Sequence, residues 1–544
     1  MSSGHHDVVM INGLPHELLI EILDFVYSSL TPHRRYIDRD NMGPRQPVLW
    51  MRINHVCMHW RKIVCTTPTL WRDIHVYCRP EWLKLCLSRI TSKPCPGLIN
   101  LYFHDLSFQL PQLFTYLEPQ QVTSLGAITF YADLAWMDMF SPLFSLPIPN
   151  LIALSIYTSH SWWPWPSRLD KAAAFPLTAY ALPRLEELTL SRIHPPTDVA
   201  LFSHMRILDL SSSLWKTSFP KLLDIMAECT LLEQLKLHNV LAGVTEVPTP
   251  ASGSPSRSLI TLPHLHTLII THAPSLDICA QILSHLLLPA ATHIEVAVDV
   301  MALGHSELHN FPITFAALLP PSVSVHIPSL SRIGAVEYVA YGDSYSLVGK
   351  ESIYDALGIV HLSLCGGTHR VVPDGLPVDL GWGVSTEIGL RDLIRVIPGT
   401  NVESLELIVN FDALSRQSLV AALGAFPKLE TLSLIGMGGV DAIWDSLTPA
   451  SEDAEVVCPQ LSNISVRGGD DNSFYASTSF LDDVVRALEA RAMRGCVLSF
   501  LQLYMCHSSA AQYATFEAAY GPRLRSLVEV VRYNPLNVDE SYEV

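Results

Sequence analysis

The chain has 544 residues, of which 49% are hydrophobic, so it has ample apolar material for a folded core and is not a disordered protein. Its 35 Lys and Arg are spread thinly among 52 Asp and Glu, giving a formal net charge of -17, which argues against a nucleic acid or an anionic membrane as partner. The 11 cysteines follow no disulfide framework, which suits reduced thiols in the cytosol or nucleus.

Targeting and membrane signals are lacking in the sequence. The opening residues, MSSGHHDVVM, have no charged segment followed by an apolar core and a cleavage site. The richest apolar run, from Ile282 to Val300, is interrupted by His285, Glu295 and Asp299. We therefore expect a cytoplasmic or nuclear protein that does not cross a membrane.

The first predicted element is an amphipathic helix within INGLPHELLIEILDFVYSSL. Pro15 fits the first helical position, where its missing N–H costs nothing, and Glu17 suits the positive end of the helix dipole. One face of this helix is apolar at helical spacing: Leu14, Leu18, Leu19, Ile22, Leu23 and Val26.

A second helix is predicted around NHVCMHWRKIVCTTPTLW, after a polar insert from Thr31 to Pro47. Its apolar stripe contains Leu49, Ile53, Val56, Cys57, Trp60, Ile63 and Val64, and its polar face contains Arg52, His55, His59 and Lys62. Because a helix places Cys57 and His59 on different faces, the stretch does not supply the roughly four converging ligands of a zinc site. The helix should end before Pro68, and TLWRDI adds Leu70, Trp71 and Ile74 as a further apolar cluster.

Three ordered motifs in the first 75 residues, LP-x-E-L-L-x-x-I-L, V-C-x-x-W-R-x-I and T-P-x-L-W, resemble the F-box, in its F-box-like form with a long insert. The resemblance implies a module that binds the Skp-type adaptor of a cullin-based ubiquitin ligase. Carried over to this sequence, it nominates as adaptor-binding residues Leu14, Pro15, Leu18, Ile22, Leu23, Val56, Cys57 and Trp60.

From about residue 98 a short pattern recurs: apolar, two residues, apolar, one residue, apolar, as in PNLIALSI, PRLEELTL and PKLETLSL. The middle apolar position of each copy serves as a register mark, and most marks lie about 30 residues apart, a spacing that indicates a solenoid. The longest step, from Ile294 to Leu362, leaves room for a missed or distorted copy. The marks are Leu101, Ile128, Leu154, Leu188, Leu208, Leu235, Leu268, Ile294, Leu362, Leu405, Leu432, Ile464 and Leu501.

Each copy ends like a strand, and the segment between copies is long enough for a helix. This arrangement resembles the leucine-rich repeat, although only Asn410 and Cys506 stand where that family places its turn-bonding Asn or Cys. We therefore predict an α/β fold, with a short N-terminal helical F-box-like module followed by an irregular leucine-rich-repeat solenoid of parallel strands with helices outside. The predicted domains are 1–75 for the module, 76–532 for the solenoid and 533–544 for an acidic tail.

The outward strand positions are the natural binding face of such a solenoid. They nominate, as residues that contact a protein target, Thr189, Asp209, Lys236, Glu406 and Ser433. A proline-rich segment, SHSWWPWPSRL, adds Trp162, Trp163 and Trp165. Two interpretations of these tryptophans stay open: binding anchors on a loop, or plugs of the core beneath it.

Enzyme-like patterns are weak. GMGGVD has Asp441 in place of the third glycine of a dinucleotide fingerprint. HSELH and CGGTH place His305, His309, Cys365 and His369 like the ligands of metal-dependent editing domains of some aminoacyl-tRNA synthetases, but the flanking pattern is absent. We expect no catalytic residue, metal or other cofactor.

The sequence therefore predicts a non-catalytic substrate receptor of a Skp-cullin-F-box ubiquitin ligase. The adaptor, and through it a cullin, would bind the N-terminal helices, and an unknown protein target would bind the repeats. Two alternatives stay open: a repeat scaffold with a vestigial F-box, and a metal-dependent hydrolase using the four residues above.

Overall fold

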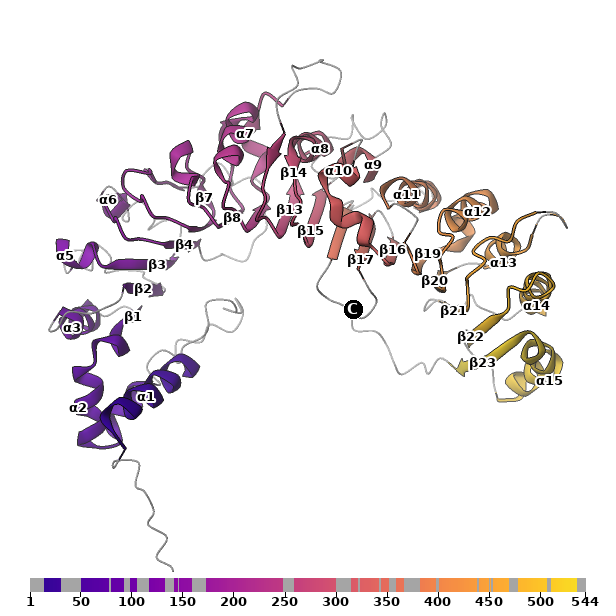
Figure 1. Cartoon of the computed structure of the whole chain (residues 1–544), viewed down its shortest axis with the longest axis horizontal. Coiled ribbons are helices and arrows are strands. Elements are labelled where there is room, and N and C mark those ends of the chain that lie inside the picture. Colours follow the sequence, from indigo (N-terminus) through magenta and orange to yellow (C-terminus); the bar gives the residue numbers. More distant parts are fainter. Residues whose placement is uncertain are drawn as a thin grey trace, which may run out of the picture. The chain divides into compact units, whose positions relative to one another are not determined.

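The structure is a computed structural model in which the chain divides into two compact units, Met1–Ser213 (unit 1) and Leu214–Val544 (unit 2) (Figure 1). Each unit is a mixed α/β fold built on a mostly parallel sheet. The structure describes residues 14–30, 50–77, 80–91, 98–104, 117–132, 141–144, 146–158, 173–247, 259–299, 315–320, 323–341, 344–351, 359–365, 382–397, 401–437, 440–449, 451, 454–468, 478–505 and 510–535.

Unit 1 begins with short helices, two of which lie in stretches where the apolar spacing predicts a helix. They are α1 (His16–Leu30), η2 (Trp50–His55), α2 (Met58–Thr66), η3 (Pro68–Trp71) and, after the first strand, α3 (Pro80–Thr91). Helix α2 ends at Thr66, and Pro68 then opens η3, where its fixed φ and missing N–H suit the first helical position. Thus η3 places Leu70 and Trp71 in the core.

Each long strand of unit 1 pairs in parallel with the next one along the chain. The strands are β1 (Asp73–Tyr77), β2 (Ile99–His104), β3 (Leu125–Ala132), β4 (Ala153–Thr158), β6 (Glu187–Ser191) and β8 (Ile207–Ser211). The connections hold α5 (Pro119–Val122), α6 (Ser141–Phe144), η6 (Val199–Phe202) and the short parallel pair β5 (Ala173–Ala174) and β7 (Ile193–His194).

The first part of unit 2 has the same arrangement of parallel strands. Its first long strands, β10 (Gln234–His238), β13 (Thr267–Ala273) and β15 (His293–Asp299), are parallel neighbours. Helices α7 (Phe219–Glu228) and α8 (Leu276–His285) lie in the connections. The remaining short elements here are η7 (Leu241–Gly243) and two parallel pairs, β9 (Thr217–Ser218) with β11 (Val244–Thr245) and β12 (Ile260–Thr261) with β14 (Leu286–Leu287).

The middle of unit 2 breaks the pattern. Strand β16 (Ala335–Tyr341) turns back into β17 (Ser344–Lys350), which turns again into β18 (Ile359–Cys365), both pairs being antiparallel. Strand β18 pairs with β15, and β16 pairs with β19 (Ser404–Asn410), both in parallel. The three strands therefore stand in the sheet in the reverse of their chain order. Three short helices precede them: α9 (Phe315–Leu318), α10 (Val323–His326) and η9 (Pro328–Arg332).

After β19 the parallel order resumes through β20 (Thr431–Met437), β21 (Asn463–Gly468), β22 (Leu498–Met505) and β23 (Val528–Pro535). In Figure 1 the helices of this part lie along one face of the strands. They are α11 (Trp382–Val396), η11 (Phe411–Ala413), α12 (Arg416–Gly424), α13 (Asp441–Leu447), α14 (Thr478–Ala492) and α15 (Ala510–Leu527).

The predicted register marks stand opposite one another wherever two of them are neighbours in the sheet of one unit, with one exception. Leu101 pairs with Ile128, Leu188 with Leu208, and Leu405 with Leu432. The exception is Leu362, because Ile294 stands opposite Val360. On β16, Val336 stands opposite Leu405, a position that the sequence pattern did not mark. The spacing alone could not place this mark, since β17 inserts an antiparallel strand.

A backbone feature recurs four residues after the register mark. Arg192, Ser212, Asn239 and His272 all have left-handed φ values, between 52° and 60°. The N–H of Arg192 donates to the carbonyl of Ser211 at 2.8 Å, and that of Asn239 to the carbonyl of Thr271 at 2.9 Å. Arg192, Ser212 and Asn239 directly follow β6, β8 and β10, so the chain leaves these strands through a left-handed residue, whereas His272 lies inside β13 where its pairing with β15 shifts. All four are non-glycine residues that adopt this region with some strain.

Candidate adaptor-binding surface and strand faces

Helix α1 has two apolar faces. Its inner face carries Leu19 and Leu23, which are 0% and 1% exposed. Helix α1 contacts η2, α2 and η3, whose buried side chains include Ile53, Ile63 and Leu70. This packing fixes the helix and so determines which of its side chains face solvent.

The outer face of α1 carries Leu18, Ile22 and Phe25, at the four- and three-residue steps that align side chains on a helix. They are 45%, 37% and 76% exposed, respectively. The sequence nominated Leu18 and Ile22 but missed Phe25, although its spacing from Ile22 was a visible signal. A large aromatic side chain left in solvent at the end of an apolar row is typical of an interaction site.

The second predicted helix is wrong as a single helix. It is broken into η2 and α2, because Cys57 is extended (φ -158°, ψ 171°) and its Sγ accepts a hydrogen bond from the N–H of Trp60 at 3.4 Å as an N-cap. The break turns Val56 outward, where it is 58% exposed beside the 84% exposed Met58, which the sequence did not nominate. His55 and His59 are both exposed, as predicted for the polar face.

The nominated adaptor-binding residues thus fall into three classes of exposure. Pro15, Leu18, Ile22 and Val56 are exposed, whereas Leu23 belongs to the core. The rest are half-buried: Leu14, Cys57 and Trp60. Their role in adaptor binding stays a prediction.

The nominated strand residues occupy outward positions between buried leucines. In unit 1, Thr189 stands opposite Asp209 in the sheet. In unit 2, the hydroxyl of Ser433 donates to Oε1 of Glu406 at 3.0 Å, and Lys236 stands opposite Ile269. The structure therefore brings two of these pairs together and leaves target binding a prediction. Trp162, Trp163 and Trp165 lie outside the described residues.

An aromatic ladder covers the outward side of β1 to β4, which the sequence did not predict. His75 stacks on Tyr102 with ring centroids 4.5 Å apart, and Tyr131 stacks between His104 and Tyr157 at 5.3 and 5.0 Å. All five occupy alternate positions to the buried residues of their strands, which was the available signal.

The two imidazoles of this ladder are in contact. Nδ1 of His75 lies 3.0 Å from Nε2 of His104, a distance at which one ring donates a hydrogen bond to the other. Burial lowers the pKa of His75 to about 4, against a smaller opposing effect of Asp73. Burial also lowers the pKa of His104 to about 3, and His75 lowers it further. Both rings are therefore neutral at pH 7.

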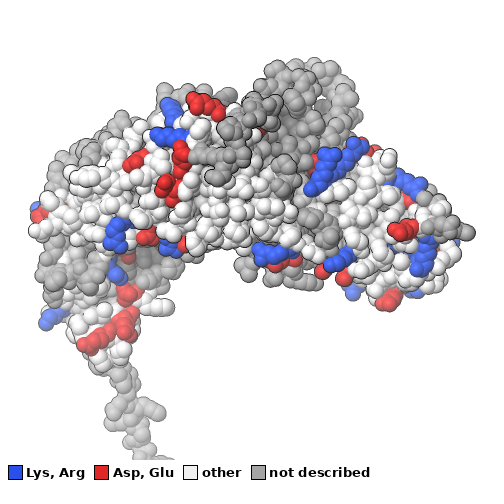
Figure 2. Space-filling view, turned by 45° about the horizontal axis from the view of Figure 1, so that its top comes forward, with Lys and Arg blue, Asp and Glu red and all other residues white. Residues whose placement is uncertain are grey.

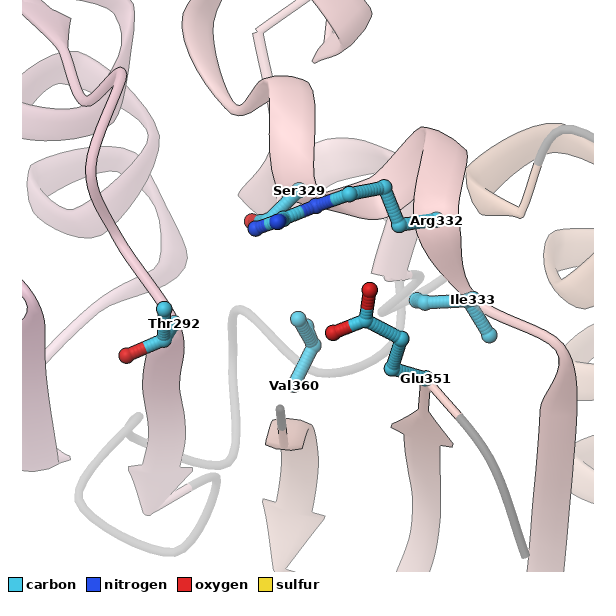
Figure 3. Close-up of a pocket in the computed structure, with 6 residues that line it drawn as sticks. All are labelled: Thr292, Ser329, Arg332, Ile333, Glu351 and Val360. Atoms are coloured by element: carbon cyan, nitrogen blue, oxygen red, sulfur yellow. The ribbon is translucent and has the colours of Figure 1, made fainter. Parts of the chain in front are cut away.

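A small hollow lies in unit 2 beside the reversed strands (Figure 3). Its walls are the side chains of Thr292, Ser329, Arg332, Ile333, Glu351 and Val360. Arg332 and Glu351 approach the space from opposite sides, and the Ser329 hydroxyl lies on the Arg332 side. The space is about 230 Å³ when the open solvent at its mouth is included, and its enclosed part has room for about one water molecule.

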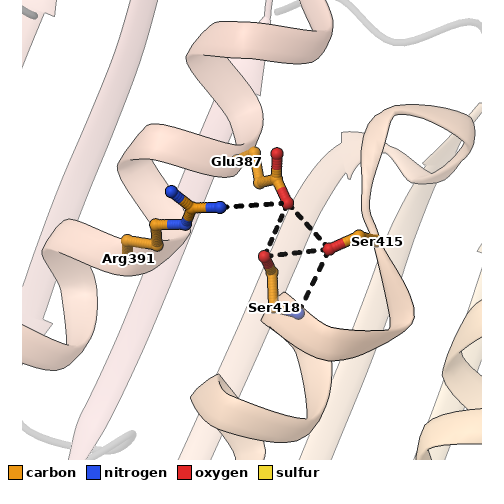
Figure 4. A network of polar contacts seen from close by, with 4 residues as sticks. All are labelled: Glu387, Arg391, Ser415 and Ser418. Carbon is orange, nitrogen blue, oxygen red and sulfur yellow. Dashed lines mark hydrogen bonds and ion pairs between the residues drawn. The ribbon is translucent and has the colours of Figure 1, made fainter.

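A polar network joins α11 to the start of α12 (Figure 4). Oε1 of Glu387 accepts hydrogen bonds from the hydroxyls of Ser415 at 2.7 Å and Ser418 at 2.6 Å, and lies 3.5 Å from Arg391. These contacts, the Ser418 bond first, lower the pKa of the Glu387 carboxyl, which makes it a poor general base. Because Ser415 also caps α12 by accepting from the N–H of Ser418, the network is structural.

The described part of the chain contains neither a cluster of metal-ligating residues nor a membrane-spanning helix. No group of three or more His, Cys, Asp or Glu there is arranged to hold a metal ion. His305, His309 and His369 lie outside the described residues, as does the side chain of Cys365. None of the described helices is both long and apolar enough to span a bilayer.

Charged side chains on the face drawn in Figure 2 stand singly or in small groups of both signs, separated by wide uncharged areas. No protein-family model matches the chain, and no curated protein matches it.

Proposed function

We propose that the chain is a non-catalytic substrate receptor of a Skp-cullin-F-box ubiquitin ligase, acting in the cytoplasm or nucleus. The observation that carries the proposal is the outer face of α1, where Leu18, Ile22 and Phe25 remain in solvent while Leu19 and Leu23 hold the helix to its neighbours. A protein that exposes such a row gains by burying it against a partner. The resemblance of the three motifs to the F-box favours a Skp-type adaptor as that partner.

We further propose that the strands form an irregular leucine-rich-repeat solenoid that binds the target. Three features support this: the register marks pair across neighbouring strands, the same left-handed turn follows several of them, and Asn410 bonds its turn. Oδ1 of Asn410 accepts from the N–H of Asp412 at 3.1 Å, which is the role of the turn-bonding residue in that family. A receptor of this kind needs no active site, because it raises the effective concentration of its target near the transferring enzyme.

The test is co-purification of the full chain with a Skp-type adaptor. The double variant Leu18→Asp, Phe25→Asp places two charges on the outer face of α1 without touching the core. We expect the dissociation constant to rise by about tenfold or more, as for the central residues of an interface. The matched control is Leu231→Asp in unit 2, because Leu231 is 44% exposed and Leu18 is 45% exposed.

Circular dichroism of each variant separates lost binding from lost folding. Adaptor binding by the double variant that equals that of the intact chain would place the interface elsewhere. A correctly folded intact chain that binds no Skp-type adaptor would contradict the ligase proposal and favour a repeat scaffold with a vestigial F-box.

A further inference from the structure

The sheet of unit 2 ends at β23, which is an edge strand (Figure 1). Among the described residues, β23 pairs with β22 alone, from Val528 to Pro535. A strand at the edge of a sheet leaves a row of backbone N–H and C=O groups without partners in the sheet. This edge is eight residues long, so it offers several hydrogen bonds to an extended segment that lies beside it.

Strand β23 also continues the apolar row of the register marks. Ile464 stands opposite Leu501, and Leu501 stands opposite Val531. Ile464 and Leu501 are both 0% exposed, whereas Val531 is only half-buried, because it has a neighbouring strand on one side. On the other face of the strand, Val530 is 45% exposed.

The helix of this last repeat closes the array differently. Among its described residues, α15 has no exposed large apolar side chain, and its exposed positions include Arg523 and Arg525. A repeat array stays soluble when its last repeat presents a polar outer surface. The helix meets this requirement and the strand does not, so the strand edge is the part that gains from a partner.

A second copy of the same strand fits this edge. A two-fold axis perpendicular to the sheet pairs two copies of β23 in antiparallel. With the axis at Val531, the two Val531 side chains cover each other, and Glu529 and Arg532 stand opposite uncharged residues. An axis at Glu529 or Arg532 would place like charges opposite each other, and an axis at Val530 would place Glu529 opposite Val531. The order of charges along β23 therefore favours its own copy, in the register centred on Val531.

We propose that the chain forms a homodimer by antiparallel pairing of β23 with β23 of a second copy, with Val531 on the two-fold axis. The pairing makes one continuous sheet from two copies of unit 2. It uses the free edge of both strands, so the assembly closes at two chains. This inference does not depend on adaptor binding or on the proposed ligase function.

The experiment is sedimentation equilibrium of the full chain from nanomolar to high micromolar concentration. We expect a mass of twice the 60.4 kDa chain at the upper end, falling to that of a single chain on dilution. Val531→Lys and Val531→Glu should each raise the dimer dissociation constant by about tenfold or more, because each places two like charges at the axis. An equimolar mixture of the two variants should dimerise again, since Lys then stands opposite Glu.

The recovery in the mixture separates a lost interface from a lost fold. The matched control is Val325→Lys in α10, at a residue that is 56% exposed and lies outside β23, and it should dimerise like the intact chain. A folded intact chain that stays monomeric at high micromolar concentration would overturn the proposal. Protection of the β23 amide hydrogens from exchange in such a monomer would show that another part of the chain covers the edge. Unchanged dimerisation of Val531→Lys, or a mixture that does not dimerise, would overturn the proposed register.

Discussion

The strands of both units bury every second residue, but the two units differ in how their strands are connected. In unit 1 every long strand pairs in parallel with the next along the chain. In unit 2 the antiparallel β17 reverses the order of three strands, yet the sheet continues through them. A strand with alternating apolar residues can therefore run parallel or antiparallel to its neighbours, because in both cases its apolar side chains lie on the same face of the sheet.

The core has adjusted to the reversed strands. On β16 the buried residue opposite Leu407 is Tyr338, whose hydroxyl donates to the carbonyl of Thr386 at 3.2 Å. Gly389 of α11 leaves the space that this ring needs, since a Cβ there would collide with the phenol. On β17, Gly349 stands where the neighbouring strands place larger residues, and Ile333 fills the gap.

The largest expected effect comes from the shared buried face. Phe130 of unit 1 and Leu432 of unit 2 are both 0% exposed. We expect Phe130→Ala and Leu432→Ala each to lower the free energy of unfolding by about 3–5 kcal/mol, from lost burial and a residual cavity. Urea unfolding of each variant measures this. If either substitution lowered the free energy of unfolding by less than about 1 kcal/mol, the two cores would not be equivalent.

The second prediction concerns unit 1 and the histidine pair of its ladder. In the unfolded chain a histidine has a pKa of about 6.5, and burial lowers the pKa of His75 to about 4. Below about pH 6.5 the unfolded state therefore binds more protons. His75 alone should lower the free energy of unfolding by about 3 kcal/mol between pH 7 and pH 4, and His104, whose pKa is also lowered, should add to this loss. Above pH 7 the pair should contribute no pH dependence.

The control for this prediction is the double variant His75→Phe, His104→Tyr, which keeps the stacked rings and removes the imidazoles. Its stability should be less sensitive to pH between 7 and 4 than that of the intact chain. Identical profiles, measured by urea unfolding at each pH, would show that the pair is not the source of acid sensitivity.

The third prediction tests the adjustment in unit 2. Gly389→Ala should lower the free energy of unfolding by about 1–3 kcal/mol, because the new methyl group overpacks against Tyr338. Gly424 is the matched control, since it also lies in a helix and a Cβ there would meet nothing within 4 Å. Gly424→Ala should raise stability by about 0.5–1 kcal/mol. Thermal unfolding should therefore give shifts of opposite sign.

The smallest expected effects belong to the outward positions. Ser433→Ala in unit 2 should lower the free energy of unfolding by about 1 kcal/mol or less, since a part-buried hydrogen bond contributes about that much. Thr189→Ala in unit 1, at an outward strand position, should change it by no more than this. If both variants fold normally, they can be used to test target binding by the strand faces. A loss comparable with that of Leu432→Ala would show that these residues belong to the core instead.

Much of the fold followed from short-range pattern. The apolar alternation placed most register marks correctly, because burial of a strand face depends on the residue type at every second position. The break at Cys57 could not be predicted from the sequence. Cys57 fits the apolar stripe of a continuous helix as well as it fits the N-cap of a new one. The placing of Leu362 failed because the pairing partner of a strand is set by residues far away in the chain.

The candidate surface on α1 could be predicted only in part from the sequence. Leu18, Leu19, Ile22 and Leu23 form one apolar stripe in the sequence, and the structure separates them into an exposed pair and a buried pair. When adjacent positions hold residues of the same type, the residue type does not show which of them packs against another helix. Phe25 could have been found, since it continues the exposed row by one helical step.

From the amino-acid sequence alone, a mixed α/β fold could be predicted, with amphipathic helices at its N-terminal end and strands that bury alternate residues. These properties depend on the order of apolar and polar side chains within a few turns or strand residues. Three features are visible in the folded structure alone: the reversed order of β16, β17 and β18, the exposed face of α1, and the positions of Arg332 and Glu351 on opposite sides of the hollow. Each of these depends on contacts between distant segments, which local pattern does not encode.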